Sequence, residues 1–130
     1  MPFNSPTARE VLKYAEEYLG AKPEYLWKNS ENAVLRHSGG KWFAALITVK
    51  RERLGLAGEG NVGIIDLKCD SVMIGSLLRD KGFYPAYHMN KEHWVTVLLD
   101  GTVESGEIIP LMELSFNLTA EKAVKREKKK

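Results

Sequence analysis

The segment from Lys41 to Val49 constrains the fold more than any other part of the chain, because it is apolar on both faces. Its side chains alternate with the two-residue period of a β-strand. The two alternating sets are Phe43, Ala45, Ile47 and Val49 on one face and Trp42, Ala44 and Leu46 on the other. A strand with two apolar faces belongs inside a sheet, so we place it in the middle of the sheet with helices over at least one face.

Further strand patterns lie on both sides of this segment. We expect pairing strands at 33–37 and 61–68, with a turn at Ser38-Gly39-Gly40 and a long exposed loop or hairpin tip from Lys50 to Gly60. Two more strands are expected at 83–89 and 93–99, joined by a turn at Asn90-Lys91. Short connections of this kind indicate antiparallel pairing.

Three helices complete the pattern. The first begins either at Thr7, as a capping box with Glu10, or at Ser5, with Pro6 in the first turn, and it ends at Gly20. Its predicted buried face consists of Ala8, Val11, Leu12, Ala15 and Leu19. The second runs from Asp70 or Ser71 to Gly82 and buries Met73, Ile74, Leu77 and Leu78. The third opens near Ser105, with Pro110 in its first turns.

These patterns predict the order α-β(3)-α-β(2)-α in a two-layer α+β domain with an antiparallel sheet. We assign residues 1–118 to this single domain and residues 119–130 to a basic C-terminal tail without core contacts. The tail carries most of the positive charge: residues 121–130 hold six Lys or Arg and two Glu, whereas the rest of the chain holds thirteen Lys or Arg and fifteen Asp or Glu. Because the body is nearly neutral, any phosphate contact there must be local.

The single cysteine and the N-terminal residues indicate the cellular compartment of the protein. Cys69 is the single cysteine, so no internal disulfide can form and a reducing compartment is favoured. The stretch from Met1 to Thr7 has neither the basic start nor the apolar centre of a secretory signal. The longest apolar run, Trp42 to Ile47, is too short to span a membrane. We therefore expect a cytoplasmic protein.

The densest cluster of chemically versatile side chains lies between the last two predicted strands. It consists of Tyr87, His88, Met89, Asn90, Lys91, Glu92, His93 and Trp94. A zinc site would combine His88 and His93 with Cys69, and a nucleophilic site would pair Cys69 with one of these histidines. Neither has the spacing of a known metal or catalytic motif, so we expect no metal, no cofactor and no catalytic residues.

Two other interpretations of this cluster are favoured. As a binding surface, His88, Asn90, Lys91 and His93 would contact phosphate or carboxylate groups while Tyr87 and Trp94 stack on the ligand. As a structural element, the two aromatic residues would fill core and Asn90-Lys91 would be a turn. The sequence leaves both open.

A resemblance to a known family rests on this cluster and its neighbours. The segments Lys68-Cys69-Asp70, Pro85 to Trp94, Leu99-Asp100-Gly101 and Leu114 to Leu118 resemble the MmcQ/YjbR family, and the likeness extends from about Thr7 to Leu118. Ser71 stands where the family usually has proline, and Phe116 where it usually has tyrosine. The resemblance implies a YjbR-like fold, close in layout to secretion chaperones, and a DNA-binding role through a "double wing" motif.

We therefore expect a non-enzymatic DNA-binding protein. We predict that cations near hairpin ends contact the DNA. These are Lys41, Lys50, Arg51, Arg53 and Lys91. We also predict that the residues of the family motif form a surface, which consists of Tyr87, His88, Asn90, Lys91, His93 and Trp94. The alternatives are a protein-interaction module of chaperone-like layout and a small-molecule-binding protein.

Overall fold

The computed structural model of the chain describes residues 3–38 and 40–128, with side chains as far as residue 120. Three helices and five strands follow the predicted order, with one short 3₁₀ helix added between the second and third strands. The elements are α1 (Pro6–Leu19), β1 (Ala33–Arg36), β2 (Trp42–Lys50), η1 (Arg51–Leu54), β3 (Asn61–Lys68), α2 (Ser71–Leu77), β4 (Phe83–Pro85), β5 (Trp94–Leu98) and α3 (Ser105–Lys128).

All five strands form one antiparallel sheet in the order β1-β2-β3-β5-β4. The predicted α+β class and antiparallel pairing are confirmed. The apolar segment around Phe43 is an interior strand as expected, although β3 is the central one because β5 inserts between β3 and β4.

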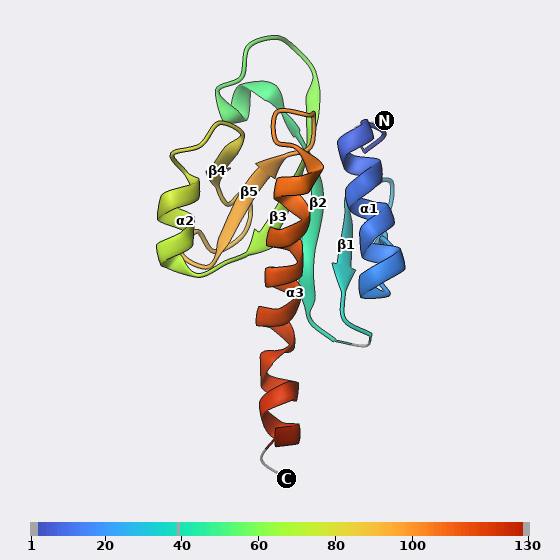
Figure 1. Cartoon of the computed structure of the whole chain (residues 1–130). Coiled ribbons are helices and arrows are strands. Elements are labelled where there is room, and N and C mark those ends of the chain that lie inside the picture. Colours follow the sequence, from blue (N-terminus) through green and yellow to red (C-terminus); the bar gives the residue numbers. More distant parts are fainter. Residues whose placement is uncertain (1–2, 39, 129–130) are drawn as a thin grey trace.

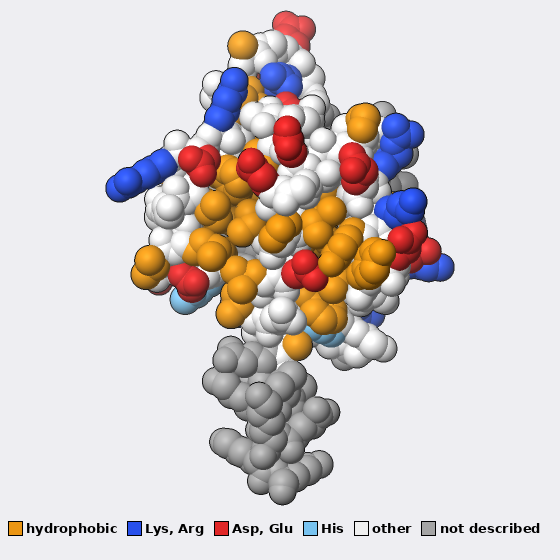
Figure 2. All heavy atoms as spheres, in the orientation of Figure 1, with side chains coloured by type: hydrophobic (Ala, Val, Ile, Leu, Met, Phe, Trp, Pro, Cys, Tyr) orange, Lys and Arg blue, Asp and Glu red, His pale blue; other side chains and the backbone are white. Residues whose placement is uncertain are grey.

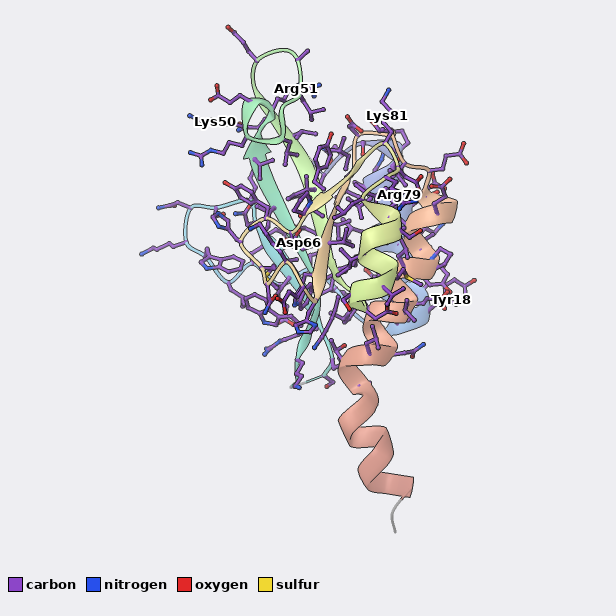
Figure 3. All side chains as sticks on the ribbon, turned by 90° about the vertical axis from the view of Figure 1, so that its left-hand side faces the viewer. Tyr18, Lys50, Arg51, Asp66, Arg79 and Lys81 are labelled. Atoms are coloured by element: carbon purple, nitrogen blue, oxygen red, sulfur yellow. The ribbon has the colours of Figure 1, made fainter. Side chains whose placement is uncertain are left out.

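The three helices lie on one side of this sheet, with α3 crossing its middle and α1 and α2 flanking it (Figures 1 and 3). The main core fills the space between the layers and includes Phe43, Leu46, Ile65, Val97 and Ile108. Along each strand, every second side chain points away from the helices. This other side of the sheet is called the open face here. A smaller apolar cluster of Val49, Val62, Ile64 and Leu98 lies there.

The start of α1 is set by Ser5, and the capping box predicted at Thr7 is wrong. Ser5 Oγ accepts the Ala8 N–H at 3.1 Å and donates to the Leu99 carbonyl at 2.5 Å, so the cap also fastens the helix to the end of β5. Thr7 is buried inside the helix instead. The predicted end at Gly20 is confirmed, since its φ of 67° is the left-handed conformation that glycine adopts without strain.

The segment from α2 to β5 is more irregular than its pattern predicts. Helix α2 ends at Leu77 rather than at Gly82, and Leu78 is 38% exposed rather than buried. Gly82 has another function: its φ is 92°, and a Cβ there would lie 2.4 Å from Val103 Cγ2. Strand β4 stops at Pro85 rather than at Met89, because the chain then leaves the sheet edge and crosses the open face.

Helix α3 continues without a break past the predicted end of the domain at residue 118. Thr119 is buried, and its Oγ1 lies 2.7 Å from His37 Nε2. Pro110 lies in the second turn of α3, where it removes one backbone hydrogen bond of the helix. The predicted division therefore falls inside a helix, and the side chains of residues 121–130 lie outside the described residues. None of the described helices is long and apolar enough to cross a membrane.

Candidate functional site

The open face is partly covered by two irregular segments, one between α1 and β1 and one between β4 and β5. Both lie on the side of the sheet away from the helices (Figure 3). A cleft of about 430 Å³ remains between them. Its walls and floor are Trp27, Ser30, Asn32, Trp42, Ala45, Ile47, His88 and Met89. Residues from both segments and from β2 therefore meet in this cleft.

Two tryptophans form one corner of the cleft. The rings of Trp27 and Trp42 pack edge to face, with centroids 5.8 Å apart and planes at 83°. Trp27 is 44% exposed, so much of its ring is available to a ligand. Tryptophan surfaces of this kind suit planar or apolar ligands.

The cleft contains two neutral polar side chains, Ser30 and Asn32. Asn32 Oδ1 accepts the Thr48 N–H at 2.9 Å, which holds the segment against β2 and leaves the amide nitrogen as a donor. Ser30 Oγ accepts the Asn32 N–H at 3.0 Å, which leaves its own hydroxyl hydrogen as a donor. The cleft thus combines aromatic surface with two donors.

A buried carboxyl group lies next to Ala45 on the same face of the sheet. Asp66 of β3 is the register partner of Ala45 on β2, and it is fully buried. Its Oδ1 accepts a hydrogen bond from Thr96, whereas Oδ2 has no partner among the described residues. Burial raises the pKa of Asp66 to about 7, against the opposing effect of the Thr96 and Tyr87 hydrogen bonds. Near neutral pH this group is therefore balanced between acid and carboxylate.

His88 separates the cleft from a second hollow of about 410 Å³. The second hollow is lined by Arg53, Leu54, Tyr84, Pro85, Ala86, Tyr87, His88 and Lys91. Arg53 comes from η1 and Lys91 from the connection between β4 and β5, so the fold brings two exposed cations together beside tyrosine rings. The two hollows share His88 and therefore lie side by side on the open face.

The wall residues adopt unusual backbone conformations. Among residues 3–38 and 40–128, the non-glycine residues with positive φ are Asn29, at 58°, and His88, at 63°. One lies in each segment beside the cleft. Strained conformations of this kind cluster at ligand-binding sites, because binding needs a fixed geometry that local propensity does not favour.

The remaining predicted cations divide between three positions. Lys50 is exposed at the end of β2, close to η1, and Figure 3 shows it with Arg51 at the loop end of the sheet. Arg51 is half-buried, and its Nε donates to the Ala57 carbonyl at 2.7 Å, so it fastens its own loop. Lys41 precedes the other end of β2, roughly 30 Å from Lys50 at the rise of a strand. The fold thus groups Arg53 and Lys91 around the second hollow, places Lys50 at a separate small hollow with Glu52 and Glu59, and leaves Lys41 apart.

The rest of the motif segment is largely a turn. Asn90 Oδ1 accepts the Glu92 N–H at 2.8 Å, and the Asn90 carbonyl accepts the N–H groups of His93 and Trp94. His93 is exposed, and its carbonyl accepts the Cys69 N–H at 2.9 Å. Trp94 is half-buried in β5. The motif residues therefore divide into two groups: Tyr87, His88 and Lys91 line the hollows, whereas Asn90 and His93 hold the turn.

The metal and nucleophile alternatives gain no support from the described geometry. No group of three His, Cys, Asp or Glu within the described part of the chain is placed to hold a metal ion. Cys69 is buried, and this burial raises the pKa of its thiol, which opposes the thiolate that a nucleophile needs.

Sequence reasoning missed the polar and aromatic cleft residues outside the motif, namely Trp27, Ser30, Asn32 and Trp42, and the buried pair of Asp66 and Thr96 beside them. Asp66 carried a usable signal, because a carboxylate inside the apolar run from Ile64 to Leu67 must be paired, protonated or functional. Trp27 carried none, since its segment has no periodic pattern.

A larger groove of about 610 Å³ lies between α1 and the segment before β1. Its charged lining residues are Arg9, Lys13, Glu16, Glu17 and Glu31. Charges of both signs line this groove, and no residue of the predicted motif takes part. The open-face surface is therefore the stronger candidate.

Comparison with known proteins agrees with the sequence motif. The YjbR family profile matches residues 17–118. The chain is 40% identical over 115 residues to the uncharacterized protein YyaQ of Bacillus subtilis (strain 168), which covers 87% of this chain and 98% of that protein. It is also similar to the crystal structure of a Pseudomonas syringae protein, with 44% identity and a TM-score of 0.81 over 85% of this chain and 97% of that chain.

A more distant structure shares the fold alone. A Deinococcus radiodurans protein with a DUF419 domain is 23% identical, with a TM-score of 0.66, and the match covers 95% of this chain and 83% of that one. The predicted YjbR-like fold and the predicted family are both confirmed. On the profile match, the identity to YyaQ and the shared fold, this chain belongs to the YjbR family.

Proposed function

We propose that this protein is a non-enzymatic DNA-binding protein, and that the DNA backbone lies across the second hollow of the open face. The observation that carries the proposal is the meeting of Arg53 and Lys91, far apart in the sequence, around one hollow with Tyr84 and Tyr87. Lys50 adds a third exposed cation at the neighbouring end of β2. Clustered cations beside aromatic rings match a phosphate backbone with accessible sugars and bases.

The charge pattern of the helix side supports this choice of face. Figure 2 shows that the middle of the helix side carries apolar and acidic side chains, while Lys and Arg lie at its margins. Acidic groups at the centre of a surface repel phosphate. The open face is therefore the better position for DNA.

The expected footprint is small. Lys50, Arg53 and Lys91 neutralise about three phosphates at most, and exposed Glu52, Glu59 and Glu92 lie near them in the sequence. Each phosphate contact lowers the slope of log affinity against log salt by about 0.9. Binding through this face therefore has a modest salt slope and modest affinity.

The test is a salt titration of duplex and single-stranded DNA binding by the full chain. The triple variant Lys50→Gln, Arg53→Gln, Lys91→Gln is expected to flatten the salt slope by roughly 2–3 units. The matched control removes three cations from the helix side, with Lys13→Gln, Arg79→Gln and Lys81→Gln, and leaves the slope unchanged. If the open-face variant binds with an unaltered slope, the basic C-terminal residues carry the binding and the proposal for the body fails.

A protein-interaction role is the second candidate. Val72 is 84% exposed and Tyr18 is 70% exposed, and apolar side chains gather on the helix side (Figure 2). Exposed apolar patches mark protein interfaces. Absence of any DNA affinity in the titration, together with concentration-dependent sedimentation of the chain, would favour this role instead.

A further inference from the structure

We propose that the cleft between Trp27 and Met89 is a pocket for a single unstacked nucleobase, so that the protein binds single-stranded DNA in preference to duplex. This inference rests on the proposed DNA-binding function and narrows it to a strand form. It assigns the base of one nucleotide to the cleft and its phosphate to the neighbouring hollow at Arg53 and Lys91.

The shape of the cleft suits a flat ring. Its volume of about 430 Å³ lies within the range of small-ligand sites, and Trp27, which lines it, is 44% exposed. The perpendicular Trp42 ring closes the corner, so a base stacked on one tryptophan presents its edge to the other. Base–aromatic stacking is the main source of affinity in proteins that bind single strands.

The polar groups suit the edge of a heterocycle. Ser30 and Asn32 supply hydrogen-bond donors to the cleft, as their own acceptor atoms are engaged by backbone N–H groups. Nucleobases carry donors and acceptors on one edge, whereas a purely apolar ligand would leave these groups without partners.

The charges suit the phosphate attached to that base. The cleft lining contains no Lys or Arg, and both cations of this surface lie beyond His88 in the second hollow. A ligand that spans the two hollows is therefore neutral and planar at one end and anionic at the other. A nucleotide has this distribution.

The depth of the site explains the preference for single strands. A cleft walled by two chain segments admits one ring, and a base inside a duplex is stacked and paired. Entry of a duplex base would require unstacking and unpairing at a cost of a few kcal/mol. Phosphate contacts alone would not distinguish the two forms in this way.

The experiment compares three ligands of about ten nucleotides at about 150 mM salt: a mixed-sequence single strand, its duplex, and an abasic strand with the same phosphates. The wild-type full chain is expected to bind the base-bearing strand at least about tenfold more tightly than the abasic strand. Trp27→Ala is expected to remove that difference without changing affinity for the abasic strand. Trp27→Phe keeps a stacking ring and retains part of the preference, and Tyr18→Ala on the helix side retains all of it.

A measurement on the wild-type protein tests the same pocket without depending on whether the Trp27 variants fold. In a titration with deoxyguanosine monophosphate, the indole N–H resonances of Trp27 and Trp42 are expected to shift, and that of Trp94, which lies outside the cleft lining, is expected not to.

The outcomes separate the two proposals. Equal affinity for abasic and base-bearing strands, or no change in Trp27→Ala, overturns the base pocket, while a salt slope that depends on Arg53 and Lys91 still supports DNA binding. Shifts at all three tryptophans or at none also overturn the pocket. No detectable binding of any DNA overturns both proposals.

Discussion

The hydroxyl of Thr96 donates a hydrogen bond to Oδ1 of Asp66 and accepts the backbone N–H of Tyr87 at 2.9 Å. Thr96 and Asp66 are register partners on β5 and β3, so this contact lies at the centre of the sheet. One hydroxyl thereby links the buried carboxyl group to the segment that carries His88 and Lys91. The link fastens to the sheet the segment that lines both hollows.

Asp66 makes stability depend on pH. Its pKa is raised by burial to about 7, above its unfolded value, so the folded chain holds a proton that the unfolded chain has released. The stabilisation is present at low pH and is lost as pH rises through about 7. Between about pH 5.5 and pH 8.5 the wild type is expected to lose about 2 kcal/mol more than Asp66→Asn, which does not titrate. Urea titrations at the two pH values measure this difference, and parallel pH profiles would contradict it.

Thr96→Val removes the hydroxyl but keeps the shape of the side chain. It leaves the Tyr87 N–H without its acceptor and Asp66 Oδ1 without its donor, so the free energy of unfolding is expected to fall by about 2–4 kcal/mol. Thr96→Ser keeps the hydroxyl and is the matched control, with a smaller loss from the missing methyl group. Equal losses in the two variants would show that packing, rather than the hydrogen bonds, is what Thr96 supplies.

The C-terminal limit of the folded body can be tested by truncation. His37 Nε2 lies 2.7 Å from Thr119 Oγ1, and the His37 ring packs on Phe116 with centroids 4.2 Å apart. A chain that ends after Leu118 loses the Thr119 contact, whereas a chain that ends after Ala120 keeps it. The shorter chain is expected to melt about 3 °C or more below the longer one. Equal melting temperatures would place the limit at residue 118, as the charge pattern alone suggests.

His88 is strained, and glycine is expected to relieve the strain. At a φ of 63° a side chain with a Cβ costs about 1 kcal/mol relative to glycine. His88→Gly should therefore be more stable than His88→Ala by about that amount, in denaturant titrations at one pH. Both variants lose the imidazole, so both should weaken DNA binding equally. If His88→Gly instead bound DNA more tightly than His88→Ala, in line with its higher stability, His88 would contribute to binding only through its backbone conformation.

The sequence predicted the fold where a pattern is local. The two-residue alternation around Phe43 identifies an interior strand, and Gly20 marks the end of a helix, because strand period and left-handed φ depend on neighbouring residues alone. The same applies to the order of elements and to the antiparallel pairing, which follow from short connections. The Tyr87 to Trp94 run identified the family and one side of the site.

Only the tertiary structure determined which residues lie opposite the Tyr87 to Trp94 run and which distant segments contact each other. Ser5 rather than Thr7 caps α1 because its hydroxyl also reaches the Leu99 carbonyl, a contact 94 residues away in sequence that no local pattern contains. Trp27 reaches the cleft only because its segment passes around the edge of the sheet to the open face. Asp66 becomes a buried acid because Thr96 and Tyr87 close over it. Such contacts join segments far apart in the chain, so only the packing of the sheet determines them.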